Sequence, residues 1–263
     1  MNKKSAFADI LLYGAQLAKV GGGAIMEYID KDFNVERKGE IDLVTEADIA
    51  SEKAILKSLR DNYPDHQVIT EERDIIKGNP EKVWIIDPLD GTTNFAHRFP
   101  MFCVSIAFMQ KGVVQTAAIY DPLRKELFTA GKGMGTAHNS VEPTVSKTDK
   151  IIDSLLATGF SYNIKTIGRN NIREFGNFAL KAQGMRRSGS AALDLAYVAC
   201  GRLDGFWEFD LNPWDMAAGA LIVEEAGGSV TRADGSPFNL MKKEIVASNG
   251  VIHDEMLKIL AIK

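Results

Sequence analysis

One uninterrupted stretch, residues 83–95, constrains what this chain can fold into more than any other part of the sequence. It begins with Val83 to Ile86, an uncharged run of β-branched and aromatic residues that predicts a buried strand. Pro88 has no backbone N–H to donate to a sheet, so we expect the strand to stop there. Asp87 and Asp90 then lie together at the end of the strand, where both carboxylates can serve one site.

The next residues, Gly91-Thr92-Thr93-Asn94, predict a glycine hinge followed by the first turn of a helix. The first N–H groups of a helix have no intrahelical acceptor and lie at the positive end of its dipole, so such a turn favours an anion. Oxygen ligands for a cation therefore stand beside backbone donors for a phosphate. Asp, Pro and Gly are also ordinary turn residues, and residues 87–91 by themselves are equally consistent with a plain turn.

Taken as a whole, residues 83–95 resemble the signature of the inositol monophosphatase family of magnesium-dependent phosphatases. Two further segments agree with that family in the same order, namely Asp42 to Thr45 with Asp48, and Trp214 to Gly219 followed by Glu225 to Gly228. The residue pattern alone supports a mixed α/β (α+β) layered fold. The resemblance, which covers nearly the whole chain, implies the five-layer αβαβα sandwich of the inositol monophosphatase/fructose-1,6-bisphosphatase type.

Length and composition are ordinary for a globular protein, with 263 residues, 45% hydrophobic and 25% charged. We predict one domain over residues 1–263, with two lobes that divide near residues 140–150. The net charge of −4, with both signs intermixed, gives no reason to expect a nucleic-acid partner. No run reaches the roughly 18 apolar residues of a membrane span. Cys103 and Cys200 lie in apolar contexts and predict buried thiols of a reducing compartment, so we expect a cytoplasmic protein.

Helical and strand patterns alternate irregularly along the rest of the chain. The run Gly21-Gly22-Gly23 lies inside the first helical pattern and indicates either a break or a close helix crossing. The stretches expected to be irregular are 31–46 and 73–82, and Gly131 to Gly135 predicts a glycine turn and no nucleotide loop. Helices are expected over 5–29, 45–59, 172–180, 193–199 and 213–226 and at the C-terminus, and strands over 66–70, 102–109, 113–120, 126–130, 151–159, 204–209 and 245–247.

Three acids outside the central stretch have both a structural and a functional interpretation. Asp48 stands three residues after Thr45, the spacing of a helix capping box. Glu71 follows an expected strand and precedes a loop, a position typical of a metal ligand, although a Glu-Glu pair is more commonly solvated charge. Asp215 falls in the first turn of an expected helix, where an acid is a good partner for the helix dipole and usually no more.

The resemblance assigns these acids to a site for two to three Mg²⁺ ions. It implies that Glu71, Asp87 and the backbone carbonyl of Leu89 hold one ion. Asp87, Asp90 and Asp215 would hold a second, and Glu71 would share a weaker third. Such oxygen ligands suit Mg²⁺. The sequence has four histidines and neither a C-x-x-C nor an H-E-x-x-H pattern, so a zinc site is not expected.

The resemblance also implies a reaction, the hydrolysis of an inositol monophosphate to myo-inositol and phosphate by a metal-activated water. Glu71 and Thr92 would orient that water, with Asp48 supporting Thr92 from behind. The positions implied to contact the substrate are Lys38, Asp90, Gly91, Thr92, Thr93, Ala191 and Glu208. A homodimer and sensitivity to lithium are further expectations that rest on the resemblance alone.

The phosphate ester itself stays open, because polyol hydroxyls are generic hydrogen-bonding partners. Fructose 1,6-bisphosphatase or histidinol-phosphatase activity at the same site is an alternative. A regulatory protein that acts through protein contacts is another, although an intact set of acids favours catalysis. The sequence also departs from the family at Thr158 to Ser161, where Ser161 replaces the usual Pro after Phe160, so the shape of that loop is open.

Overall fold

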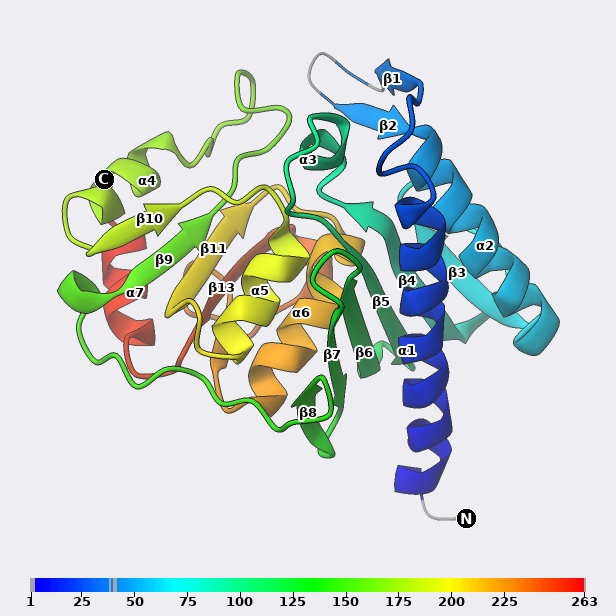
Figure 1. Cartoon of the computed structure of the whole chain (residues 1–263). Helices are drawn as coiled ribbons and strands as arrows, with labels where there is room; N and C mark the ends of the chain where they lie inside the picture. The colour runs from blue at the N-terminus through cyan, green and yellow to red at the C-terminus, as the bar shows by residue number, and fades with distance from the viewer. Residues whose placement is uncertain (1–2, 38, 40–41, 263) are drawn as a thin grey trace.

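The computed structural model describes residues 3–37, 39 and 42–262 (Figure 1). Lys38, an expected substrate contact, lies outside the described residues. Two large sheets have helices between them and on both outer faces. This arrangement is the αβαβα sandwich that the resemblance implied.

The first large sheet has six strands in the order β3-β4-β5-β6-β7-β8. Its strands are β3 (His66–Thr70), β4 (Asn79–Asp90), β5 (Cys103–Gln110), β6 (Val113–Asp121), β7 (Glu126–Gly131) and β8 (Gly135–His138). Only β3 and β4 pair in parallel; the remaining neighbours are antiparallel. The predicted run of consecutive antiparallel strands and the predicted turn at Gly131 to Gly135 are therefore confirmed.

The second large sheet has five strands in the order β10-β9-β11-β13-β12. They are β9 (Leu155–Thr158), β10 (Gly184–Arg186), β11 (Gly205–Phe209), β12 (Ser229–Thr231) and β13 (Glu244–Ser248). A separate antiparallel pair, β1 (Val35–Arg37) and β2 (Leu43–Thr45), lies in the stretch that was expected to be irregular. Three-residue strands are too short to show a period of two, which is why the sequence pattern missed β1, β2, β10 and β12.

Seven helices are described: α1 (Lys3–Met26), α2 (Glu46–Asn62), α3 (Thr92–Ala96), α4 (Ile172–Ala179), α5 (Ala191–Ala199), α6 (Pro213–Glu225) and α7 (His253–Leu260). Helices α1 and α2 cover one face of the six-stranded sheet, where Trp84 and Ile86 pack with Leu17 and Ile55. Helices α5 and α6 fill the space between the sheets, against Ile85 of the same strand. Both faces of β4 are thus buried, which explains its apolar sequence.

Strand β4 corrects one expectation at the site, because it continues through Pro88 to Asp90. Its pairing with β5 is irregular between Asp87, which lies opposite Ser105, and Asp90, which lies opposite Cys103. Pro88 falls inside this irregularity, where no ladder hydrogen bond is required of it. The strand also begins at Asn79, so the expected loop to residue 82 is too long by four residues.

Two other expectations are also settled. Helix α1 runs unbroken through Gly21 to Gly23, and a Cβ at Gly21 would lie 2.7 Å from Ile55 of α2, so the glycines serve a close helix crossing. The expected strand 151–159 instead begins as a short 3₁₀ helix, Ile151–Asp153, before β9.

Both cysteines are free thiols, but only Cys103 is fully buried; Cys200 is partly exposed. In the part of the chain that the structure describes, none of the helices has the length and apolar character to cross a bilayer.

Candidate active site

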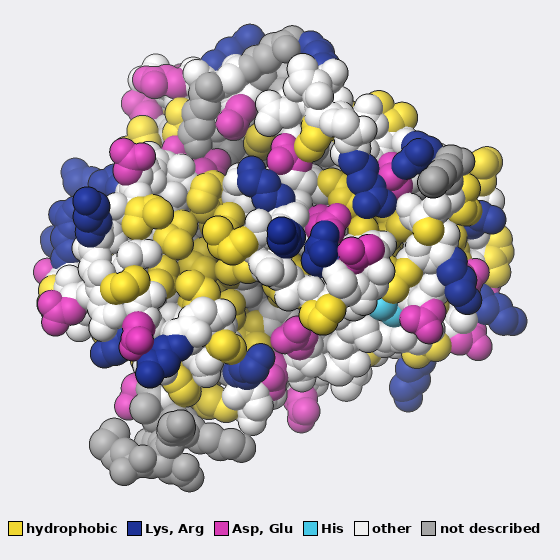
Figure 2. All heavy atoms as spheres, turned by 180° about the vertical axis from the view of Figure 1, so that it is seen from behind, with side chains coloured by type: hydrophobic (Ala, Val, Ile, Leu, Met, Phe, Trp, Pro, Cys, Tyr) yellow, Lys and Arg dark blue, Asp and Glu magenta, His cyan; other side chains and the backbone are white. Residues whose placement is uncertain are grey.

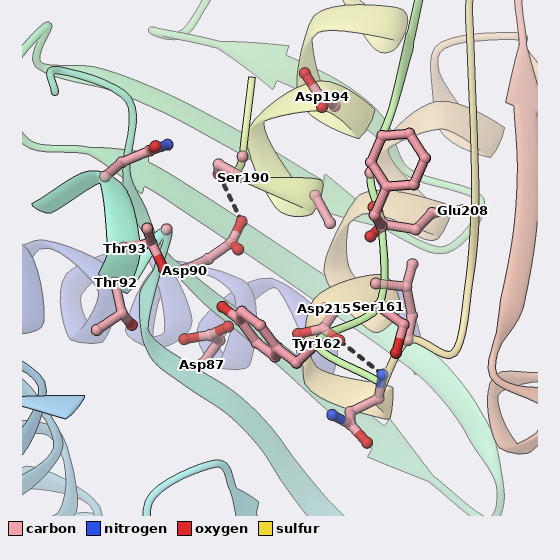
Figure 3. Close-up of a pocket in the computed structure, with 18 of the residues that line it drawn as sticks. Asp87, Asp90, Thr92, Thr93, Ser161, Tyr162, Ser190, Asp194, Glu208 and Asp215 are labelled. Carbon is pink, nitrogen blue, oxygen red and sulfur yellow. Dashed lines mark hydrogen bonds between the residues drawn. The ribbon is translucent and has the colours of Figure 1, made fainter. Parts of the chain in front are cut away.

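A cavity of about 520 Å³ opens where the ends of β4 and β11 meet the starts of α3, α5 and α6 (Figure 3). Most of the site residues expected from the sequence line it, although they come from distant parts of the chain. They are Glu71, Asp87, Leu89, Asp90, Gly91, Thr92, Thr93, Ala191, Glu208 and Asp215. Asp48 lies outside the lining and contacts Thr92, which lines the cavity.

The glycine hinge after β4 is required by the local geometry. Gly91 is the N-cap of α3 and has a φ of 96°, a conformation that favours glycine. A Cβ at this position would lie 2.8 Å from the carbonyl oxygen of Met101. The chain can therefore turn sharply enough to place Asp90 and Thr92 on the same cavity.

Asp87 and Asp90 each use one carboxylate oxygen within the protein. Asp87 Oδ1 accepts a hydrogen bond from the Leu89 N–H at 3.0 Å. Asp90 Oδ2 accepts from Ser190 Oγ at 2.6 Å and from the Ala192 N–H at 2.8 Å. Asp90 thereby joins the end of β4 to the start of α5, a contact across 100 residues that spacing in the sequence does not reveal.

The structural role considered for Asp215, as a partner of the helix start, is confirmed. Asp215 is the third residue of α6 and forms a capping box with Asn212, whose N–H donates to Asp215 Oδ2 at 2.6 Å. The same carboxylate also lines the cavity. The cap fixes the side chain on the cavity side of the helix start, opposite Asp87 (Figure 3).

The capping role expected of Asp48 is confirmed, and its side chain also contacts Thr92. The capping box with Thr45 is present, since Asp48 Oδ2 accepts from the Thr45 N–H at 2.8 Å and from Thr45 Oγ1 at 2.5 Å. Its other oxygen, Oδ1, accepts from Thr92 Oγ1 at 2.8 Å. The Thr92 hydroxyl has a second acceptor, the Leu89 carbonyl at 3.1 Å, but the Asp48 carboxylate is the nearer of the two. With its proton donated to either acceptor, the Thr92 oxygen can accept a hydrogen bond from a group in the cavity.

The acids of the cavity repel one another in a buried position. Burial, followed by the charges of Glu71 and Asp90, raises the pKa of Asp87 well above its usual range. Burial and the charge of Asp90 do the same for Asp215. For Asp90 burial also raises the pKa, against the hydrogen bonds from Ser190 and Ala192. A buried cluster of carboxylates destabilises the folded state unless protons or cations neutralise its charge.

These residues fit a divalent cation by their chemistry. They offer only oxygen donors, which is the set that Mg²⁺ takes, and their crowding is relieved by a positive charge. Among the described residues, no three acids, histidines or cysteines lie close enough together to hold a metal ion as they stand. Asp87, Asp90 and Asp215 each have one carboxylate oxygen that accepts from a protein N–H.

The opposite wall of the cavity carries Glu208 on β11 and Asp194 on α5. Burial raises the pKa of each carboxyl to about 8. A Cβ at Gly159 would lie 2.2 Å from both Glu208 oxygens, so only glycine leaves room for this carboxylate. Asp194 accepts a hydrogen bond from Ser188 Oγ at 2.5 Å. Arg187 is the only lysine or arginine among the described residues that line the cavity.

The loop after β9 supplies residues that the sequence analysis did not assign to the site. Ser161 Oγ donates to Asp210 Oδ2 at 2.6 Å and accepts from the Asn163 N–H at 2.9 Å, which fastens the loop to the end of β11. Tyr162 lines the cavity, and its ring extends between Asp87 and Asp215 (Figure 3). The only signal for this loop in the sequence is the departure from the family pattern at Ser161. Asn94, Arg187 and Ser190 also line the cavity and were not predicted.

Comparison with known proteins agrees with this architecture. The model of the inositol monophosphatase family matches residues 8–262. The chain is 47% identical over 244 residues to the inositol-1-monophosphatase of Synechocystis, covering 91% of this chain and 84% of that one. It is 43% identical over 251 residues to the Nus factor SuhB of Escherichia coli, covering 94% of each chain. The structure of inositol monophosphatase from Anabaena (Nostoc) superposes with a TM-score of 0.89 at 41% identity, covering 97% of this chain and 96% of that one.

The layered fold and the acid-lined cavity thus define a phosphatase of the metal-dependent sandwich class. Within that class, the chain belongs to the inositol monophosphatase family.

Proposed function

We propose that the protein is a Mg²⁺-dependent phosphomonoesterase that hydrolyses inositol monophosphate to myo-inositol and phosphate. One observation carries the proposal: Glu71, Asp87, Asp90 and Asp215, from separate parts of the chain, line one cavity together with the start of α3. Similarity to an inositol-1-monophosphatase over most of the chain supports this choice of substrate.

Glu71, Asp87, Asp90, Asp215 and the Leu89 carbonyl would hold two to three Mg²⁺ ions. When bound, Mg²⁺ lowers the pKa of water and neutralises charge on the phosphate. Thr92, held by Asp48, accepts a hydrogen bond from the attacking water and so sets its direction toward phosphorus. The N–H groups of Gly91 to Thr93 donate to phosphate oxygens. Glu208 and the backbone at Ala191 bind polyol hydroxyls on the opposite wall.

The test is phosphate release with Mg²⁺, with and without EDTA, from a panel of esters: inositol 1-phosphate, fructose 1,6-bisphosphate, histidinol phosphate, glycerol 2-phosphate and 3′-phosphoadenosine 5′-phosphate. We expect EDTA-sensitive turnover with the highest kcat/KM for inositol 1-phosphate. If folded protein that binds Mg²⁺ turns over none of these esters, the enzymatic proposal is wrong.

A sugar bisphosphate is the second candidate substrate, and Arg187 is the observation that favours it. A second phosphate at the far end of the substrate would meet the one arginine among the described lining residues. A preference for fructose 1,6-bisphosphate that disappears in Arg187→Met would select this alternative.

A role through protein contacts, in addition to or in place of catalysis, is favoured by the similarity to the protein named Nus factor SuhB. Inhibition by lithium and a homodimeric state remain proposals that follow from the family, and a cytoplasmic location remains a proposal that follows from the two cysteines. Inhibition by LiCl at fixed Mg²⁺ and light scattering of the purified protein test the first two.

A further inference from the structure

Helix α2 presents an unusual buried polar face toward the site. Asp48, Ser51 and Glu52 follow the spacing of one helix face, and their exposed fractions are 0%, 0% and 1%. Polar groups are costly to bury unless they are hydrogen-bonded, so each should have a partner. Asp48 accepts from Thr92 at the start of α3, and Ser51 Oγ donates to the Pro88 carbonyl of β4 at 2.7 Å.

Glu52 is the third residue of this helix face, and it contacts residues on both sides of Glu71 in the sequence. Its Oε1 accepts from the hydroxyl of Thr70, the residue before Glu71, at 3.2 Å. Its Oε2 accepts from Arg73 Nε at 2.7 Å and also from Arg73 Nη2. One buried carboxylate thus holds the two ends of the segment that carries Glu71, a residue that lines the cavity.

The ion pair between Glu52 and Arg73 is largely shielded from solvent on the Glu52 side. The Glu52 side chain is 2% exposed while that of Arg73 is 41% exposed, so the arginine closes the pair from the solvent side. The hydrogen bonds that two nitrogens of Arg73 donate to one Glu52 oxygen raise the pKa of Arg73 above its usual value. Loss of the arginine would leave a buried carboxylate without its cation, a larger penalty than loss of a surface ion pair.

We infer that Glu52 and Arg73 form a positioning pair for the metal site: by anchoring both ends of the Thr70–Arg73 segment to α2, they hold the Glu71 carboxylate at the cavity beside Asp87. The inference rests on the proposed metal-dependent function. Arg73 is not among the residues that line the cavity, so its influence on the site passes through the position of Glu71. The pair therefore acts mainly on the affinity for metal. Thr92, which orients the attacking water in the proposed function, is held by Asp48 and not by this pair, so the chemical step should change much less once metal is bound.

The test compares wild type, Arg73→Met and Arg73→Lys by isothermal titration with Mg²⁺ and by the Mg²⁺ dependence of phosphate release. We expect Arg73→Met to bind Mg²⁺ about 10-fold more weakly, as is typical when a partner behind a metal ligand is lost. The kcat at saturating Mg²⁺ should stay within about twofold of wild type. Arg73→Lys, which keeps the charge without the planar fork, should lie between the two.

The matched control is Arg202→Met, which removes another arginine from a glutamate, Glu126, outside the cavity lining. Its Mg²⁺ affinity should equal that of wild type. An unchanged affinity in Arg73→Met, or an equal loss in Arg202→Met, would overturn the inference while the proposed function stands. If Arg73→Met does not fold, an unchanged affinity in Arg73→Lys overturns it. If wild type itself binds no Mg²⁺, the proposed function fails and the inference fails with it.

Discussion

The two walls of the cavity are built in different ways. On the metal wall, Asp87, Asp90 and Thr92 come from one continuous passage of strand, glycine hinge and short helix. On the opposite wall, Gly159, Asp194 and Glu208 come from a loop, a helix and a strand that packing brings together. Local spacing accounts for these three residues of the first wall, whereas Glu71 and Asp215 join it from the end of β3 and the start of α6. The shape of the second depends on tertiary contacts, and in the proposed function this second wall selects the substrate.

The metal wall should be the less tolerant of the two. Asp90→Asn removes a charge from the metal ligands and weakens the acceptor for Ser190 and Ala192. We expect kcat for inositol 1-phosphate to fall by about 100-fold or more. Even the loss of a residue that only hydrogen-bonds to a metal ligand typically lowers metal affinity or activity by about 10- to 100-fold. The exposed Asp234→Asn is the control. Near-normal turnover in Asp90→Asn would remove the basis for calling this wall catalytic.

Thr92→Val keeps the shape of the side chain and removes its hydroxyl. Asp48 Oδ1 would lose its donor, and the cavity would lose the oxygen that orients the attacking group. We expect kcat to fall by about 10- to 100-fold with little change in KM. Thr92→Ser, which retains the hydroxyl, should recover most of the activity. A serine variant as impaired as the valine variant would show that packing, and not the hydrogen bond, matters here.

The opposite wall should respond in KM. Gly159→Ala places a Cβ 2.2 Å from the Glu208 oxygens and must displace that carboxylate. We expect KM for inositol 1-phosphate to rise by up to about 10-fold, as for the loss of one hydrogen bond, with Mg²⁺ affinity unchanged. Gly168→Ala, in the same loop with open space around its Cβ, is the matched control. A fall in Mg²⁺ affinity in Gly159→Ala would show that the two walls are not separable.

The smallest expected effect concerns stability and pH. Folded Asp194 keeps its proton up to a pKa of about 8, whereas an unfolded aspartic acid loses it near pH 3.9. The folded state therefore binds more protons between these values, and stability must fall as pH rises across this window. In EDTA, the denaturation midpoint of wild type should fall from pH 5 to pH 8. In Asp194→Asn the fall should be smaller, with the raised pKa of Glu208 accounting for part of what remains.

The exposed Asp149→Asn serves as the control for that pH series. It should follow wild type at every pH. An Asp194→Asn variant with the slope of wild type would mean that Asp194 is ionised in the folded protein below pH 8.

The same contrast explains how much could be predicted from the sequence. The layered fold, the cap at Thr45, the β5–β6 hairpin and the passage from β4 to α3 follow from short-range spacing, because caps, turns and strands are local. The bond between Asp90 and Ser190 and the close approach of Gly159 to Glu208 join residues at least 49 positions apart. No period or motif encodes such contacts.

Pro88 and Ser161 illustrate the remaining errors. Proline normally ends a strand, but an irregular pairing between β4 and β5 lets the strand pass through it, which local preference does not foresee. Ser161 was noted only as a departure from the family, yet its hydrogen bond to Asp210 fixes the loop that brings Tyr162 to the cavity. The place of this loop at the cavity becomes visible only with its partner Asp210, the residue that follows β11.

The most direct test of the account is a crystal structure of the protein grown with Mn²⁺ and recorded at the manganese absorption edge. Manganese prefers the same oxygen ligands as Mg²⁺ and gives an anomalous signal. The account predicts anomalous peaks in the cavity, with Asp87, Asp90 and Asp215 as ligands and Glu71 beside them. An active protein whose manganese lies elsewhere, or whose cavity binds none at saturating concentration, would contradict it.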